Sequence, residues 1–381
     1  MTFSKQSWYL SIIILFIFTS CDNSPEPEDE DQTGTSIYEK IDSIANGYYN
    51  TGKLAGFSVA VLCDGDTLYN KAFGYSDLDQ QIVASTETKF AIASVTKLIT
   101  ATAIMKLVEQ GKLSPDQTLF EVMPDFPVPE QARKITIRHL LMHTSGLVDY
   151  AEYIDSLYIQ DNIQPTRQTY FDFLKRQLLH FEPGTSFSYT NTGFILLGFI
   201  IEDLSGMLYE DFIEKTISEP LNLGSLKHLN RNIGQGTSRC YQWQDSIFVK
   251  SDIDSIFYFK GDGGLSATAL DLAHVPVGLA DGSVISAKSL NQMKQTADFA
   301  DGNRTGYGLG MRTGYFEGRR VWGHTGGHRN YFRTLAYFPD DRVSIAVLNN
   351  TDDAPVDALF IEGDVAAAVF GLKTPDLEEM E

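Results

Sequence analysis

Strand-like segments stand at both ends of this chain, on either side of a middle whose apolar spacing is mostly helical. Residues 57–63 and 66–73 are apolar runs joined by Asp64-Gly65, a dipeptide typical of hairpin turns. Strand signals return only near the C-terminus, where Gly and Pro turns separate runs at 311–316, 319–322, 331–338 and 342–348. The pattern predicts one sheet built from both chain ends, with a helical insertion between them.

The middle of the chain, from Ser94 to about residue 230, has the three- and four-residue apolar spacing of helices. Helices are predicted at 137–142, 169–179, 192–204 and 209–217, and Gly206 is expected to end the third of them. Two further helices are predicted at 38–49 and 356–370, next to the strands at either end.

The charge balance of the chain argues against a nucleic-acid partner. Fifty acidic and thirty basic residues give a formal net charge of −20, which repels a phosphate backbone. The three cysteines, Cys21, Cys63 and Cys240, are too few and too scattered for a disulfide framework or a thiolate metal site.

The N-terminus has the features of an export signal. Residues 8–18 form an apolar run that is too short to span a membrane, with Lys5 as the only preceding charge. The run ends in Phe-Thr-Ser-Cys21, which resembles a lipobox, so Cys21 is predicted to carry a lipid anchor. The alternative is a plain signal peptide with an incidental cysteine. We expect a signal peptide at 1–20, an acidic disordered tether at 21–35, a globular domain at 36–372 and an acidic tail at 373–381.

The first candidate site is Ser94-Val-Thr-Lys97, which opens an amphipathic helix. Residues three apart share a helix face, so Lys97 is expected beside the Ser94 hydroxyl, with free N–H groups of the helix start nearby. A serine nucleophile needs such help. The alternative is that Ser94 only caps the helix and Lys97 is a solvated lysine of its first turn.

Two later segments supply candidate partners. Tyr189-Thr-Asn191 lies between a Pro-Gly turn and a helix, and a neighbouring ammonium favours the phenolate that would let this tyrosine act as a base. The glycines of His324-Thr325-Gly326-Gly327 permit close backbone approach, and a free N–H there would complete an oxyanion hole with the N–H of Ser94.

Together and in this order, the three segments resemble the motifs of the penicillin-recognising serine hydrolases: class C β-lactamases, serine D-alanyl-D-alanine carboxypeptidases and related esterases. The resemblance runs from about residue 38 to about 371. It implies an α/β (α+β) fold in which an antiparallel sheet flanked by helices (about 36–93 and 231–372) is joined to an all-α lobe (about 94–230), with the site between them.

The resemblance also implies a role for each candidate residue. Ser94 is the acylated nucleophile, Lys97 shares its proton, and Tyr189 is the base that also activates the deacylating water. The N–H groups of Ser94 and Gly327 hold the oxyanion. The substrate is bound by Asn191, His324, Thr325 and Gly326. No cofactor is implied.

The sequence departs from dedicated β-lactamases at His324, where they carry lysine. A histidine with a pKa near 6.5 is mostly neutral at about pH 7 and anchors an anionic β-lactam more weakly. A carboxypeptidase-like or esterase-like enzyme acting on a small peptide, β-lactam or ester is therefore expected, outside the cytoplasm and anchored to the cell envelope. A class C-like β-lactamase and a non-catalytic envelope lipoprotein that binds or senses β-lactams or peptides are the alternatives.

His139 and His143 have the spacing of a zinc pair but lack a glutamate between them, so no metal is expected.

Overall fold

The computed structural model describes residues 35–161, 165–232, 236–251, 260–299, 304–327 and 333–374. Its largest sheet has seven strands in the order β3-β2-β1-β12-β11-β10-β9. The N-terminal strands are β1 (Gly56–Cys63), β2 (Asp66–Asp77) and β3 (Ile82–Val83). The C-terminal strands are β9 (Arg312–Phe316), β10 (Arg319–Gly326), β11 (Arg333–Phe338) and β12 (Val343–Asn349).

The sheet joins the two chain ends through β1 and β12. These strands pair antiparallel along their whole length, from Phe57 opposite Asn349 to Cys63 opposite Val343. The prediction of one antiparallel sheet built from both ends is therefore confirmed. It follows from two almost fully apolar strands, which only a position at the centre of a sheet can bury on both faces.

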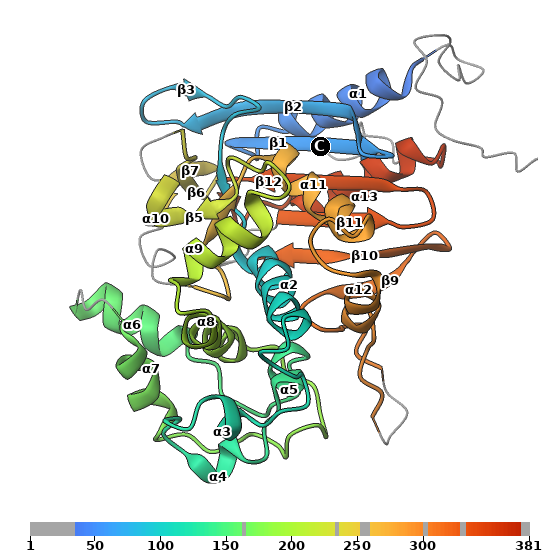
Figure 1. Cartoon of the computed structure of the whole chain (residues 1–381). Helices are drawn as coiled ribbons and strands as arrows, with labels where there is room; N and C mark the ends of the chain where they lie inside the picture. The colour runs from blue at the N-terminus through green and yellow to red at the C-terminus, as the bar shows by residue number, and fades with distance from the viewer. Residues whose placement is uncertain are drawn as a thin grey trace, which may run out of the picture.

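Helices cover both faces of this sheet (Figure 1). On one face, α1 (Ile37–Asn50) and α13 (Ala358–Val369) pack against each other and close one hydrophobic core. On the other, α11 (Ala269–Ala280) packs on β1 and β12, and α12 (Ala287–Met293) contacts α11. A second and larger core continues from this face into the helical lobe.

The all-α lobe occupies the lower part of Figure 1. At its centre, α2 (Thr96–Glu109) packs against α8 (Asn191–Ser205), and both are buried on almost every side. Around them lie shorter helices: α3 (Leu119–Val122), α4 (Pro129–Ala132), α5 (Ile137–Leu141), α6 (Ala151–Asp161), α7 (Arg167–Leu174) and α9 (Tyr209–Ile213). As predicted, α8 ends at Gly206, which adopts a left-handed conformation with φ 70°.

Four short strands correct the prediction that strands return only near the C-terminus. These are β5 (Lys227–His228), β6 (Cys240–Gln244), β7 (Ile247–Ser251) and β8 (Leu265–Ala267). With β4 (Phe90–Ala91) and β13 (Thr351–Asp352) they form two three-stranded sheets. The strands have two to five residues, too few for an alternating pattern to be recognised in the sequence.

Three predicted helices also differ from the structure. The helix predicted at 169–179 ends at Leu174, and the one predicted at 209–217 changes at Glu214 into a π-helical turn, η2 (Glu214–Ser218). The last helix begins at Ala358 because Asp357 caps it, accepting hydrogen bonds from two backbone N–H groups. Helices α11 and α12 were not predicted, and α11 contains Pro276 within it.

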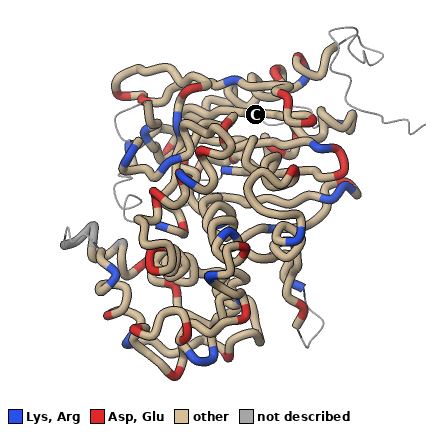
Figure 2. The backbone as a smooth tube through the Cα atoms, in the orientation of Figure 1, with Lys and Arg blue, Asp and Glu red and all other residues tan. Residues whose placement is uncertain are grey.

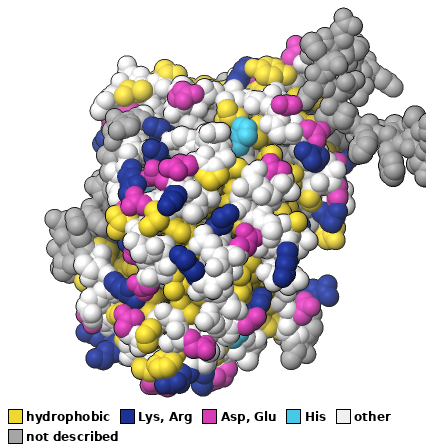
Figure 3. All heavy atoms as spheres, in the orientation of Figure 1, with side chains coloured by type: hydrophobic (Ala, Val, Ile, Leu, Met, Phe, Trp, Pro, Cys, Tyr) yellow, Lys and Arg dark blue, Asp and Glu magenta, His cyan; other side chains and the backbone are white. Residues whose placement is uncertain are grey.

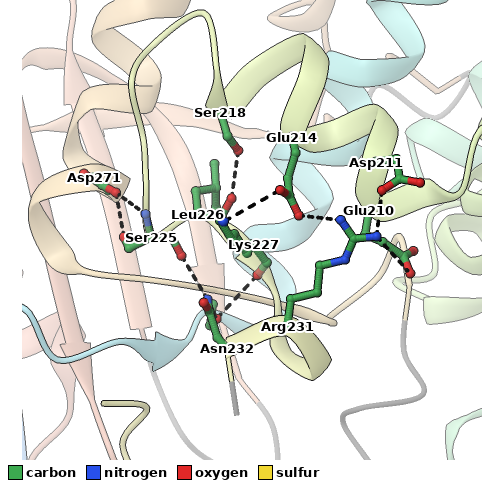
Figure 4. A network of polar contacts seen from close by, with 11 residues as sticks. Glu210, Asp211, Glu214, Ser218, Ser225, Leu226, Lys227, Arg231, Asn232 and Asp271 are labelled. Atoms are coloured by element: carbon green, nitrogen blue, oxygen red, sulfur yellow. Dashed lines mark hydrogen bonds and ion pairs between the residues drawn. The ribbon is translucent and has the colours of Figure 1, made fainter. Parts of the chain in front are cut away.

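A polar network connects residues 210–232 to β8 and to the start of α11 (Figure 4). The Arg231 guanidinium, on α10 (Leu229–Asn232), donates to Asp211 and Glu214. Ser225 donates from its backbone and its hydroxyl to Asp271 at the start of α11. Asn232 donates to Ser266 Oγ on β8 at 2.6 Å. The network therefore holds β8 in place, and β8 follows directly after a Gly-rich turn that enters the candidate site.

Acidic and basic side chains are dispersed along the described chain, with no basic stripe in the view of Figure 2. The same mixture covers the face drawn in Figure 3. Within the described ranges no single helix is long and apolar enough to span a membrane, and α8 passes that test only together with the segment after it, across a 76° bend. The predicted signal peptide, the tether up to residue 34, Cys21 and most of the predicted acidic tail lie outside the described residues.

Candidate active site

Ser94 lies in a one-turn 3-10 helix, η1 (Ala93–Val95), that leads directly into α2. The residue before it, Ala93, has φ 44°, a left-handed conformation that is costly for a residue other than glycine. No side chain caps η1 or α2. The alternative that Ser94 serves as a helix cap therefore has no support, and its hydroxyl is available to another partner.

That partner is Lys97, one turn further along the chain. The Lys97 side chain is fully buried, and its Nζ lies 3.0 Å from Ser94 Oγ. Nζ also donates to Asn191 Oδ1 at 2.7 Å and to the main-chain oxygen of Asp262 at 2.8 Å. An ammonium has three N–H donors, and these three acceptors use all of them. Lys97 is therefore a fixed, buried group and not a solvated lysine of the first turn.

Asn191 is oriented by Asp149. The carboxylate of Asp149 accepts from the Asn191 backbone N–H at 2.7 Å and from Nδ2 at 3.2 Å. With the Lys97 bond to Oδ1, these contacts fix which way the amide faces. An amide NH₂ has two hydrogens, so the second one is left for a substrate carbonyl.

Tyr189 lies on the other side of Lys97. The centre of its ring is 5.0 Å from Lys97 Nζ, and the ring of buried His143 stacks 4.2 Å behind it. His143 is fixed in turn, because its Nδ1 accepts from the backbone N–H of Thr190 at 3.2 Å. Burial lowers the pKa of His143 well below its ordinary value, so the ring is neutral. A rigid apolar wall thus holds Tyr189 next to the ammonium.

The end of strand β10 closes against the turn that carries Ser94. At Gly326 a Cβ atom would lie 2.3 Å from the Ile92 carbonyl oxygen and 3.3 Å from the Ser94 nitrogen, so only glycine fits there. Thr325 precedes this contact and Gly327 follows it. The structure therefore brings the third predicted segment to the backbone of Ser94.

His324 is buried, and both its ring nitrogens form hydrogen bonds within the protein. Its side chain is 2% exposed, its Nδ1 is 2.6 Å from the Thr325 carbonyl oxygen, and its Nε2 is 2.9 Å from Tyr307 Oη. Because a carbonyl only accepts, Nδ1 carries the hydrogen and Nε2 accepts from Tyr307. Burial, together with the charges of Lys97 and Arg312, lowers the pKa of His324 to about 3. His324 is thus neutral, and both its ring nitrogens are bonded within the protein. Its contact with a substrate stays a prediction.

His139 and His143, which have the sequence spacing of a zinc pair, contact different parts of the protein. His139 Nδ1 accepts from the backbone of Thr136 at the start of α5, whereas His143 packs on Tyr189, so the two histidines have separate structural partners. Ser145 Oγ accepts from the Leu147 backbone N–H in the turn that follows α5. In the described ranges, no group of three or more His, Cys, Asp or Glu side chains is placed to hold a metal ion.

Sequence reasoning missed three residues of this site. Asp149, Tyr307 and Asp262 lie outside the three motifs, and each reaches the site through a contact between distant segments. Asp262 had a weak signal in the sequence, because it precedes Gly263-Gly264, and two adjacent glycines are typical of a turn.

The comparisons with known proteins agree with this geometry. The family model described as Beta-lactamase matches residues 41–369. Penicillin-binding protein 4* of Bacillus subtilis (strain 168) is 29% identical over 305 residues, which are 76% of this chain and 66% of that protein. Protein flp of Staphylococcus aureus (strain MRSA252) is 31% identical over 62% of this chain and 47% of its own length. The chain thus spans less than two thirds of these curated relatives.

Two solved structures of similar proteins share the fold of this chain. The octameric penicillin-binding protein homologue from Pyrococcus abyssi superposes with a TM-score of 0.76 at 30% identity, covering 88% of this chain and 77% of that chain. D-amino acid amidase from Ochrobactrum anthropi SV3 superposes with a TM-score of 0.71 at 25% identity, covering 86% of this chain and 98% of that chain. The predicted fold class is therefore confirmed.

Proposed function

Since this chain belongs to the beta-lactamase family of serine hydrolases, we propose that it cleaves a peptide, amide or ester through an acyl-enzyme formed on Ser94. The observation that carries the proposal is the fully buried Lys97 ammonium, 3.0 Å from Ser94 Oγ. Burying a charge costs several kcal/mol or more unless it is well bonded, and a merely structural serine does not require such a neighbour.

In the proposed reaction, Ser94 Oγ attacks the carbonyl carbon of the substrate. An ammonium has no lone pair, so the charged form of Lys97 cannot take the serine proton; Tyr189, whose ring centre lies 5.0 Å from Lys97 Nζ, is the base. The Ser94 and Gly327 N–H groups bind the oxyanion, while Asn191 Nδ2 binds a substrate carbonyl. The tetrahedral intermediate then collapses: the bond to the leaving amine or alcohol breaks, and that group takes the proton from Tyr189. A water molecule next gives a proton to Tyr189 and attacks the acyl carbonyl, which releases the acid, and the proton returns to Ser94 Oγ.

The substrate we propose is a D-amino-acid peptide or amide, or a simple ester, ahead of a β-lactam. Neutral His324 supplies no cation for a β-lactam carboxylate. Of two similar proteins, one is named for binding penicillin and the other is a D-amino acid amidase, and the second supports an amide of a D-amino acid as the substrate here. A class C-like β-lactamase is the second candidate.

A substrate panel tests this proposal. We expect the full chain in detergent to hydrolyse a chromogenic ester, a D-amino-acid amide or a D-alanyl-D-alanine peptide with kcat/KM at least about tenfold above that for a chromogenic cephalosporin. Rates are measured by absorbance or by product chromatography. A higher value for the cephalosporin favours the β-lactamase, and turnover of none of the four favours a protein that only binds.

We further propose that the protein is exported and attached to a membrane through a lipid on Cys21. The support is the sequence of the N-terminal segment, with its apolar run and its small residues before the cysteine. Cells expressing the full chain with a labelled fatty acid are expected to incorporate label, and Cys21→Ser is expected to lose it. Equal labelling of both proteins would contradict the anchor, and Cys240→Ser is the matched control.

A further inference from the structure

The Gly-rich turn from Lys260 to Gly264 is wedged between the two central helices of the lobe. A Cβ atom at Gly261 would lie 2.4 Å from the Phe194 carbonyl oxygen on α8, so the turn and that helix are in close contact. The turn presents two carbonyl oxygens to α2: Gly261 O accepts from Thr100 Oγ1 at 2.6 Å, and Asp262 O accepts from Lys97 Nζ at 2.8 Å. The position of Lys97 therefore depends on this turn.

The side chain of Asp262 is buried behind the same contact. Only 2% of the residue is exposed, its Oδ2 accepts from the hydroxyl of Tyr150, and no described group donates to Oδ1. A buried carboxylate with so few donors is costly unless a positive charge lies nearby. The nearby charge is the ammonium of Lys97, which favours the ionised form of Asp262.

These contacts belong to one hydrogen-bond network around Lys97. Lys97 donates to the main-chain oxygen of Asp262, and the carboxylate of Asp262 accepts from Tyr150. Asp149, the residue before Tyr150, orients Asn191, and Asn191 accepts from Lys97. Two of the acceptors of Lys97 are therefore connected through Asp149 and Tyr150, neighbours in the sequence.

We propose that Asp262 is a positioning residue for Lys97: with Tyr150 it fixes the carbonyl that binds the ammonium, and it supplies the buried negative charge that compensates it. Acylation then requires Asp262 in its ionised form. The inference rests on the proposed function, because it assigns a role in the reaction of Ser94.

The pH dependence follows from the surroundings of Asp262. Burial raises the pKa of its carboxyl to about 6, although Lys97 and the Tyr150 hydrogen bond act to lower it. As pH falls through this value the carboxylate is neutralised, Lys97 loses its compensating charge, and acylation slows. The titratable groups facing Asp262 are Lys97 on α2, Asp149 and Tyr150 before α6, and Tyr209 on α9.

Two variants separate this role from a purely structural one. Asp262→Asn keeps an oxygen that can accept from Tyr150 but removes the charge, so labelling of Ser94 by a fluorophosphonate should slow about tenfold at neutral pH. The labelling rate of this variant should also no longer decrease as the pH falls through about 6. Tyr150→Phe removes a bond that lowers the pKa of Asp262, so the fall should move to higher pH. Rates are measured on the full chain in detergent from about pH 4 to about pH 9.

The matched control is Asp364→Asn on α13, the acceptor of a similar buried bond from Tyr48 on the far face of the sheet. It should keep the pH profile of the unmodified protein even if its melting temperature falls. An Asp262→Asn profile that keeps the fall near pH 6, while Ser94→Ala is not labelled, would overturn the inference and leave the proposed function standing. If the unmodified protein is neither labelled nor active, the proposed function fails and the inference fails with it.

Discussion

Ser94→Ala is expected to lose all covalent labelling by a fluorescent penicillin or a fluorophosphonate, and to lower turnover of the best ester by at least about 10⁴-fold. The substitution removes the hydroxyl oxygen of Ser94, which lies 3.0 Å from Lys97 Nζ, and the smaller alanine side chain fits without a clash. No helix cap is lost, because the Ser94 side chain caps neither η1 nor α2. The melting temperature should therefore change by no more than about 3 °C.

The matched control for this prediction is Ser145→Ala. Ser145 is a fully buried serine two residues from His143, and its Oγ accepts a hydrogen bond from the Leu147 backbone N–H. It should retain labelling at the rate of the unmodified protein. Labelling that survives in Ser94→Ala and disappears in Ser145→Ala would move the nucleophile to the turn after α5.

Lys97→Met is expected to lower the rate of acylation by about 10²- to 10⁴-fold. Methionine keeps the length of the apolar stem but removes the three hydrogens that hold Ser94, Asn191 and the Asp262 carbonyl together. The substitution also removes the positive charge that lies 5.0 Å from the centre of the Tyr189 ring. Stopped-flow labelling of the full chain measures the loss, with KM for the ester determined in parallel.

Lys106→Met is the matched control, since Lys106 is on the same helix and its Nζ donates to a carbonyl, that of Val284, at 2.7 Å. It should acylate at the rate of the unmodified protein. A Lys97→Met protein that is folded and acylates within about twofold of the unmodified rate would contradict the role given to the lysine.

Much of the fold could be predicted because its defining signals are local. The Asp64-Gly65 hairpin, the apolar strands β1 and β12, and the Gly206 helix end each follow from a few adjacent residues. The parts that were missed depend on tertiary contacts. Strands β5 and β8 have only two and three residues, and they form because β8 pairs with β5 on one side and with β4 on the other. Likewise α11 is helical despite Pro276, because it is buried against β1 and β12.

The site shows the same division. Ser94 and Lys97 are one helical turn apart, so their contact could be expected from spacing. The contacts of Asn191 with Asp149 and of Lys97 with Asp262 join segments 42 and 165 residues apart, and no spacing rule reaches that far. The sequence predicts a mostly neutral His324, but not that its pKa is lowered to about 3, because this results from burial and from the charges of Lys97 and Arg312.

Mapping the acyl-enzyme by mass spectrometry tests whether Ser94 is the nucleophile. The full chain in detergent is mixed with a fluorescent penicillin or a slow ester, quenched in acid, digested, and analysed by peptide mass spectrometry. A single adduct is expected on Ser94, absent from Ser94→Ala and retained in Ser145→Ala. An adduct on another residue, or ester turnover by the unmodified protein with no adduct and undiminished turnover by Ser94→Ala, would contradict the role of Ser94 as the nucleophile.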